Sequence, residues 1–194
     1  MKRSVAVLAL FATLALGACT QFALVEPQKP VTLGSAYTIE PHVAWSRTST
    51  GPRELWTIDG PLLDSVRFFN GLVDGDSLFE PTVARTDQLP LYRKSMTPLE
   101  IRDFVFASLN RAGYEKLATD DLRVADFGGD QGFRFEHRFA TEDGLRKKGF
   151  FIGAINNGRL YLIEFAAPEI YYYEKHRATV ERMIGSIRPK GSST

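Results

Sequence analysis

Cysteine is almost absent from this chain of 194 residues, which has one, and histidine is scarce, with three. A single cysteine excludes a disulfide-stabilised scaffold, and His42, His137 and His176 lack the short spacing of zinc ligands from one segment. Charge of one sign is not in excess, because 24 Lys and Arg face 23 Asp and Glu. A bulk electrostatic preference for nucleic acid is therefore excluded. No glycine pattern follows a predicted strand and opens a helix, so we expect no nucleotide cofactor, and the spacing of the histidines predicts no metal site.

The one long hydrophobic run of the sequence lies near its amino end. Residues 4–16 carry no charge and follow Lys2 and Arg3, which is the arrangement of a secretory signal peptide. The run is too short to remain as a comfortable membrane-spanning helix. We therefore expect residues 1–18 to be a signal peptide that is removed from the mature protein.

The predicted signal peptide leads into a four-residue motif that contains the single cysteine. Leu16, Gly17, Ala18 and Cys19 resemble the bacterial lipobox, in which an aliphatic residue and two small residues fit the signal-peptidase cleft. The resemblance implies that the Cys19 sulfur takes diacylglycerol and that the chain carries further acyl groups such as palmitate. Each buried methylene contributes about 0.8 kcal/mol, so several acyl chains together anchor a protein stably. The alternative is an ordinary secretory signal with an incidental cysteine.

The mature chain is predicted to consist of a tether, one folded domain and a tail. Residues 19–34 contain Pro27 and Pro30, which block regular pairing, so we predict a lipidated cysteine followed by a flexible tether. Residues 35–188 alternate short apolar segments with turns and are long enough for one globular domain. Residues 189–194 are predicted to be a disordered tail.

Short apolar segments predict eight strands in this domain. The strands at 149–155 and 160–165 are apolar on both faces except for Glu164, which indicates a central position in a sheet. Along the strand at 133–139, alternate residues place three phenylalanines and His137 on a buried face, and the charged residues between them on a wet face. The strands are predicted at 37–39, 43–45, 55–58, 65–69, 122–127, 133–139, 149–155 and 160–165.

Two helices are predicted, one between the two groups of strands and one after the last strand. Thr97 is an N-cap, Pro98 takes the first helical position and Glu100 completes a capping box, so the start of the first helix is well defined. The second helix is predicted over residues 168–187, with Ile170 on its inward face. The fold class that follows is α+β, a mainly antiparallel β-sheet flanked by helices.

Four local sequence features stand out in the second half of the domain. They are the turn Gly128-Gly129-x-x-Gly132, the strand Phe133-Arg134-Phe135-Glu136, the hairpin Asn157-Gly158-Arg159-Leu160-Tyr161 and the helix end Ile184-Gly185-Ser186-Ile187-Arg188. In these features the chain resembles the PsbP-like α/β/α sandwich, a group that includes photosystem subunits and bacterial periplasmic lipoproteins of the DcrB-like group. The segment Trp56-x-x-Asp59-Gly60 is also similar to an uncharacterised proteobacterial lipoprotein family. The resemblance implies a binding or assembly module and supplies no catalytic residues.

Residues 75–78 spell G-D-S-L, the signature of an esterase family in which the serine is the nucleophile. Such an enzyme also needs a histidine base oriented by a carboxylate, and in that family an aspartate stands three residues before the histidine. Here Tyr173 occupies that place before His176. Glycine, aspartate and serine also favour turns, so we predict a turn and no enzyme activity. An esterase that uses Ser77 is the alternative.

Aromatic residues provide the candidate interaction surface. Three consecutive tyrosines at 171–173 cannot all face the core of a helix at 100° per residue, so we predict Tyr171 and Tyr172 at the surface. Trp45 and Trp56 lie on neighbouring predicted strands, where they form either a core pair or an exposed part of the same surface. Tyrosine and tryptophan are enriched at the centres of protein interfaces.

These observations together predict a non-catalytic binding or assembly module that is held on a membrane. Its partners are expected to be the membrane itself, through acylated Cys19, and an unidentified envelope protein or lipid. Thr20 stands where an aspartate would resemble the inner-membrane retention signal of Gram-negative lipoproteins, which implies the outer membrane and a periplasm-facing domain. The alternative is a carrier of a lipid or small ligand, which requires a dry concave pocket between sheet and helix.

Overall fold

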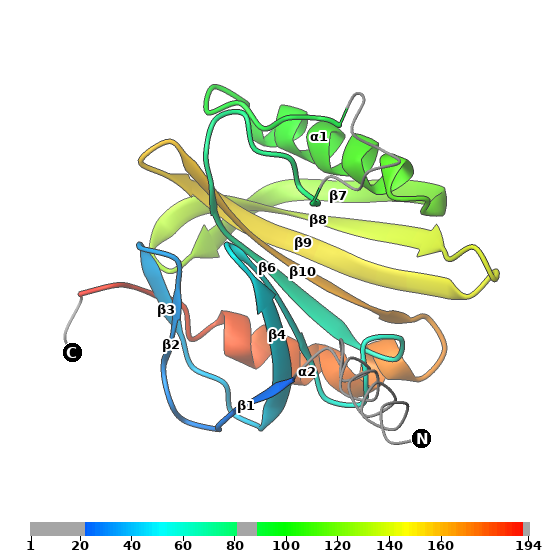
Figure 1. Ribbon diagram of the computed structural model, residues 1–194, viewed down its shortest axis with the longest axis horizontal. Coiled ribbons are helices and arrows are strands. Elements are labelled where there is room, and N and C mark those ends of the chain that lie inside the picture. The colour runs from blue at the N-terminus through cyan, green and yellow to red at the C-terminus, as the bar shows by residue number, and fades with distance from the viewer. Residues whose placement is uncertain (1–21, 81–88, 192–194) are drawn as a thin grey trace, which may run out of the picture.

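The computed structural model describes residues 22–80 and 89–191 (Figure 1). The predicted signal peptide, its motif Leu16, Gly17 and Ala18, and the candidate lipidation site Cys19 therefore lie outside the described residues.

One large antiparallel sheet of eight strands organises the described chain. In spatial order its strands are β1 (Ala23–Val25), β4 (Trp45–Thr50), β5 (Arg53–Thr57), β6 (Ser65–Leu72), β10 (Arg159–Pro168), β9 (Arg146–Asn156), β8 (Asp130–Ala140) and β7 (Glu115–Phe127). A smaller antiparallel sheet contains β11 (Arg188–Pro189), β3 (Tyr37–Ile39) and β2 (Val31–Leu33). The predicted central strands are confirmed, because β9 and β10 are flanked by strands on both sides.

The sheet is buried on both faces, because consecutive residues of its strands enter two different hydrophobic clusters. Phe68 belongs to the cluster that contains α2 (Tyr172–Ile184) and the smaller sheet, whereas Phe69 belongs to the cluster that contains α1 (Pro98–Arg111). Figure 1 shows α1 at the top of the molecule and α2 at the bottom. The prediction of a mainly antiparallel sheet with two helices is confirmed.

The start of α1 is the local element that the sequence predicts most closely. The Thr97 side chain accepts a hydrogen bond from the Glu100 backbone N–H, and the Glu100 carboxylate accepts one from the Thr97 N–H. Pro98 occupies the first helical turn, and Gly113 follows the helix with a φ of +86°. The predicted capping box is therefore present in full.

Replacing Thr97 with alanine is expected to lower the free energy of unfolding by about 1 kcal/mol, because the first turn of α1 loses its side-chain cap. Chemical denaturation measures the change. The matched control is Thr32→Ala, which removes an exposed threonine from β2 and should leave stability nearly unchanged. Equal effects of the two substitutions would show that the cap contributes nothing.

The amino-terminal part of the described chain corrects the predicted tether. From Ala23 onward the chain is already part of the fold, since β1 pairs with β4 in the large sheet and β2 pairs with β3 in the smaller sheet. Pro27 lies in the connection between β1 and β2, where it interrupts neither strand. The carboxyl-terminal boundary also moves, because Pro189 pairs with Tyr37 instead of belonging to a disordered tail.

The second helix begins later than predicted. Pro168 is the last residue of β10, where it pairs with Lys147. Helix α2 starts only at Tyr172, after Tyr171, whose backbone has a positive φ of +72°. Ile170 therefore lies in the connection and is exposed, so its predicted inward position is wrong.

The outward face of β8 is also less wet than predicted. Arg134 is buried because α2 covers it, and its guanidinium makes two hydrogen bonds of 2.9 and 2.8 Å to the Glu181 carboxylate. The guanidinium carbon also lies 3.6 Å from the ring centre of Phe150. The inward face, with its phenylalanines and His137, is buried as predicted.

Candidate functional site

An ionisable network lies on the α1 side of the sheet, across β6, β10 and β8. The register places Arg67 opposite Glu164, and an Arg67 Nη1 to Glu164 Oε2 hydrogen bond of 2.7 Å joins them. His137 Nε2 lies 3.6 Å from Glu164 Oε1, which is close but too far for a hydrogen bond. Gly149 leaves the room for this ring, since a Cβ there would come within 2.8 Å of His137 Nε2 and 1.9 Å of the Phe165 carbonyl oxygen.

Burial controls the charges in this network. Glu164 and His137 are fully buried, and burial lowers the pKa of His137 to about 4, although the Glu164 carboxylate partly opposes the shift. Burial also disfavours the charge on Arg67, but Glu164 outweighs that effect and raises the pKa of the guanidinium. The pKa of Lys147 on the same face is lowered by burial and by Arg67. The network at neutral pH is therefore an Arg67–Glu164 ion pair beside a neutral histidine.

Several atoms of the network lack a hydrogen-bond partner among the described residues. They are Glu164 Oε1 and both ring nitrogens of His137. A buried polar atom without a partner costs about 1–3 kcal/mol, and such atoms often mark a functional site or a bound water. The network is thus more polar than the fold needs for its own packing.

A cavity of about 620 Å³ lies at the Arg67 end of this network. Strands β4 to β6, the end of α1 and the connection after β6 form its walls, and its apolar lining includes Leu55, Phe69 and Phe79. Arg67 and Tyr114 line it as well, with the Arg67 guanidinium carbon 5.9 Å from the centre of the Tyr114 ring. Burial raises the pKa of Tyr114, so its hydroxyl remains a neutral hydrogen-bond donor. The volume falls within the range of ligand pockets, about 300–1,000 Å³.

Arg53 holds the connection after β6 against this cavity. Its guanidinium donates to the carbonyl oxygens of Leu78 at 2.9 Å and Ser77 at 2.6 Å, and it forms an ion pair with Glu80. The Ser77 hydroxyl donates to the Phe79 carbonyl oxygen at 2.6 Å. The predicted turn is found at Asp74 and Gly75, and Ser77 forms an isolated β-bridge with Leu91. In the described chain no hydrogen bond joins the Ser77 hydroxyl to a histidine.

The predicted aromatic surface is only partly at the surface. Tyr171 is exposed and Tyr172 is half-buried, whereas Trp45 and Trp56 are both buried, with ring centres 6.4 Å apart. The prediction of an interaction surface is therefore wrong for the two tryptophans. They form a core pair, which was one of the two arrangements that the sequence left open, and they belong to the same hydrophobic cluster as the smaller sheet.

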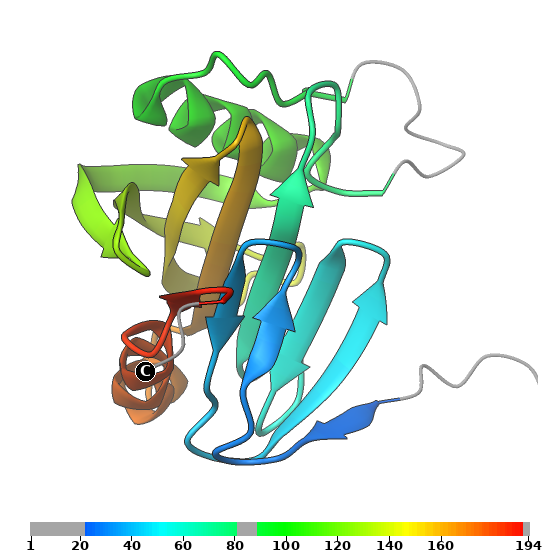
Figure 2. The ribbon, with the colours of Figure 1, turned by 90° about the vertical axis from the view of Figure 1, so that its left-hand side faces the viewer.

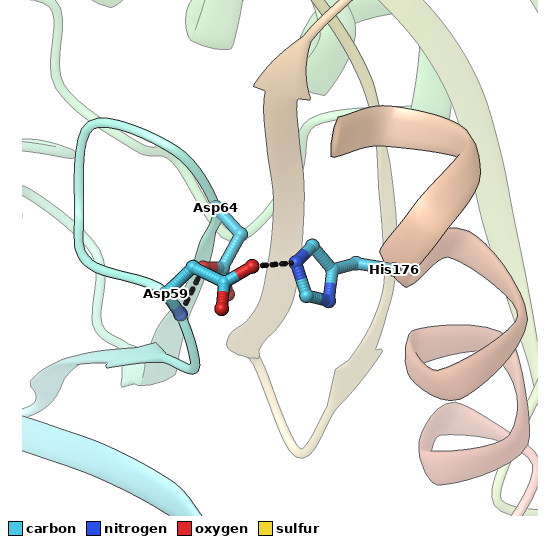
Figure 3. A group of neighbouring side chains, drawn as sticks. All are labelled: Asp59, Asp64 and His176. Atoms are coloured by element: carbon cyan, nitrogen blue, oxygen red, sulfur yellow. Dashed lines mark hydrogen bonds and ion pairs between the residues drawn. The ribbon is translucent and has the colours of Figure 1, made fainter. Parts of the chain in front are cut away.

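Asp59, Asp64 and His176 form a second polar cluster, between the β5–β6 connection and α2 (Figure 3). One ligand atom of each lies within 4.8 Å of the others, as a metal site would require. However, the Asp64 carboxylate already accepts hydrogen bonds from the backbone N–H groups of Ile58 and Asp59. Asp59 Oδ2 lies 2.8 Å from His176 Nε2 and also contacts Lys175. These contacts hold the β5–β6 connection against α2. They give Asp59 of the Trp56-x-x-Asp59-Gly60 segment a structural role.

The buried state of His137 predicts a specific dependence of stability on pH. The pKa of His137 is about 4 in the folded chain against an ordinary value of 6.5, so the unfolded chain binds the extra proton between these values. Stability is therefore lost as the pH falls from 6.5 towards 4, and the contribution of His137 is about 3 kcal/mol. The measurement is the unfolding free energy of the native protein and of His137→Gln from neutral pH down to about pH 4. The variant should lose less stability over this range, and parallel curves would contradict the assignment.

Comparisons with known proteins identify structures that have a similar fold. No protein-family model matches the chain, and no curated protein matches it. The structure is similar to the solution structure of cyanobacterial PsbP from Synechocystis sp. PCC 6803, with a TM-score of 0.55 and 13% sequence identity over 90% of this chain and 98% of that chain. It is less similar to LpqN of Mycobacterium tuberculosis, involved in cell envelope biogenesis, with a TM-score of 0.38 and 9% identity over 87% and 90% of the two chains. The first similarity confirms the predicted PsbP-like fold and concerns the fold alone.

Neither described stretch of the chain contains a helix that is long and apolar enough to cross a membrane.

Sequence reasoning did not identify the Arg67–Glu164 pair or the cavity beside it. One signal was available, because Glu164 is the single polar residue in an otherwise apolar strand. Its partner stands 97 residues earlier in the sequence, and only the pairing of β6 with β10 brings the two together.

Proposed function

We propose that the mature protein is a lipid-anchored, non-catalytic binding module on the periplasmic face of the outer membrane. In this proposal a PsbP-like α/β/α sandwich provides the scaffold, and the cavity at Arg67 receives part of an envelope component. The observation that carries the proposal is the ion pair between Arg67 and the fully buried Glu164 at the edge of a cavity of about 620 Å³. The lipobox-like motif at Leu16 to Cys19 supports the anchor and the location.

The ion pair supports binding better than it supports stability. Replacing a buried ion pair by apolar residues is often neutral or stabilising, so folding alone gives little reason to retain one. Arg67 has 24% of its side chain exposed, whereas its partner has none. A guanidinium carries five N–H donors, and that of Arg67 makes a hydrogen bond to Glu164 and also interacts with the Tyr114 hydroxyl. The remaining donors suit an acceptor or anionic group on a bound molecule.

The lining of the cavity also favours a second candidate function, a carrier of a lipid or other small apolar ligand. Leu55, Phe69 and Phe79 supply an apolar wall, and Arg67 and Tyr114 supply polar groups at one end. A molecule with an apolar body and a polar head would match both. The two candidates differ in whether the occupant is a segment of a macromolecule or a free small molecule.

In-cell photo-crosslinking of the acylated protein tests the proposal. A photoreactive amino acid replaces Leu55 in the cavity, and the matched control replaces Leu145, an exposed leucine of the β8–β9 turn. We expect a discrete adduct from position 55 and none from position 145. A macromolecular adduct supports the binding module, whereas a small-molecule mass increment supports the carrier. Equal labelling at both positions would contradict a binding role for the cavity.

Two further measurements address the other parts of the proposal. The mass of the mature protein should show acylation at Cys19, and the Cys19→Ser variant should lack it. The purified protein should not hydrolyse short acyl esters. Hydrolysis that is lost in Ser77→Ala would overturn the non-catalytic assignment in favour of the esterase.

A further inference from the structure

Exposed apolar side chains gather at one end of the large sheet. Of the large apolar side chains in the described chain, four of the five most exposed are Ile170 (86%), Leu62 (75%), Leu24 (67%) and Tyr171 (65%). The remaining one is Val124 (70%), on β7 at the opposite edge of the sheet. Scattered apolar residues are normal on a surface, but a group at one site marks a contact surface.

The sheet register places the first two segments of this group at the same end of the sheet, with β4 between them. Leu24 of β1 pairs with Ser46 of β4, and Ser46 pairs with Thr57 of β5. Thr57 is the last residue of β5, and the connection at 58–64 that follows it holds Leu62. Leu24 therefore lies in the row of residues from which this connection leaves the sheet.

The third segment is fastened to the second by the Asp59 contacts. Asp59 in the 58–64 connection contacts Lys175 and His176 in the first turns of α2. This helix begins directly after Ile170 and Tyr171. Strand β1 and helix α2 both lie at the lower end of the molecule in Figures 1 and 2, whereas α1 lies at the upper end in both. We call the group Leu24, Leu62, Ile170 and Tyr171 the docking edge.

The length of chain before β1 identifies what covers the docking edge. This step rests on the proposed acylation of Cys19. Three residue steps separate Cys19 from Phe22, the first described residue, and an extended chain spans at most about 3.3–3.6 Å per step. Phe22 therefore lies within about 10 Å of the acylated residue, and the folded domain cannot stand away from the bilayer as a long tether would allow.

We propose that the docking edge inserts into the interfacial region of the lipid bilayer that holds the Cys19 acyl chains. The charges beside it suit this role, because Lys175 is paired with Asp59 and Lys29 with Glu26, so the edge presents apolar groups and neutralised charges. Tyrosine rings favour the boundary between lipid and water. Apolar side chains in this position reach about 5–10 Å into the interface. Helix α1 then points away from the membrane.

Depth-dependent fluorescence quenching of the full acylated protein tests the docking edge. Cys19 is the single cysteine and its sulfur is used by the lipid, so the substitution Leu62→Cys introduces one free thiol for an environment-sensitive dye. The matched control is Val124→Cys, at a similarly exposed position. Each labelled protein is reconstituted into vesicles of phosphatidylethanolamine and phosphatidylglycerol that contain nitroxide-labelled acyl chains. We expect several-fold stronger quenching at position 62 than at position 124, and the same result at Ile170→Cys.

The possible outcomes separate the docking edge from the anchor. Acylated, vesicle-bound protein with equally weak quenching at positions 62, 170 and 124 overturns the docking edge and leaves the anchor standing; an edge that serves a protein partner would give this result. A mature protein without acyl mass and with a reactive Cys19 thiol overturns the anchor and the docking geometry together. Selective quenching at positions 62 and 170 supports both.

Discussion

Phe135→Ala is expected to lower the free energy of unfolding by about 3–5 kcal/mol, because it leaves a large cavity in a closely packed core. Phe135 lies on the inward face of β8 and is fully buried. Its ring centre lies 6.4 Å from that of Phe133 and 5.1 Å from that of Phe151, and both pairs are stacked. The substitution removes the middle ring of this row on the α1 side of the sheet, and neither neighbour can fill the space without leaving its own contacts.

Urea denaturation at neutral pH measures this effect, and an unchanged dependence on denaturant concentration shows that the comparison concerns the native state. The control is Val124→Ala, which truncates an exposed side chain on the edge strand β7 and should change stability by less than about 0.5 kcal/mol. A loss below about 1 kcal/mol at Phe135 would show that the buried face of β8 is wrongly assigned.

Local sequence signals predicted those parts of the fold whose causes are local. The capping box at Thr97 and Glu100 needs only four consecutive residues, and it is present as predicted. Alternation along β8 identified its buried face in the same way. The start of α2 differs, because Pro168 suits the first position of a helix and Ile170 fits the spacing of its inward face. Pairing of β10 with β9 as far as Pro168 delays the helix, and that pairing is a long-range contact.

The short elements at the two ends of the chain were missed for a related reason. Strands β1 and β2 have three residues each and β11 has two, which is too short for a periodic pattern to be recognised. Pro27 and Pro30 correctly indicate irregular backbone between β1 and β2, but they say nothing about the residues on either side. The short distance from Cys19 to the fold, on which the docking edge depends, was therefore visible only in the structure.

The wet face predicted for β8 shows the limit of alternation as a signal. Polar residues at alternate positions usually face solvent, yet Arg134 is covered by α2 and satisfied by Glu181. The same limit applies to the candidate site. Glu164 was recognisable as an exception in an apolar strand. Predicting its pairing with Arg67 would have required the register between two strands that are far apart in sequence.

Arg67→Met is expected to cost about 3–5 kcal/mol of unfolding free energy, because it leaves the buried Glu164 carboxylate without its partner. The double variant Arg67→Met with Glu164→Leu should recover most of this loss, since apolar residues of similar size can replace a buried ion pair without a net penalty. Denaturation of the two single variants, the double variant and the native protein closes a double-mutant cycle. Losses that simply add in the double variant would mean that the two groups are not coupled.

The same double variant separates stability from binding at the cavity. It should fold, yet it lacks the guanidinium that we expect to meet the polar group of the bound component. If the Leu55 crosslink disappears in the double variant while its stability is near native, Arg67 acts in recognition and not only in folding. If the crosslink persists unchanged, the apolar wall formed by Leu55, Phe69 and Phe79 is sufficient for binding, and the ion pair is a structural feature beside the cavity.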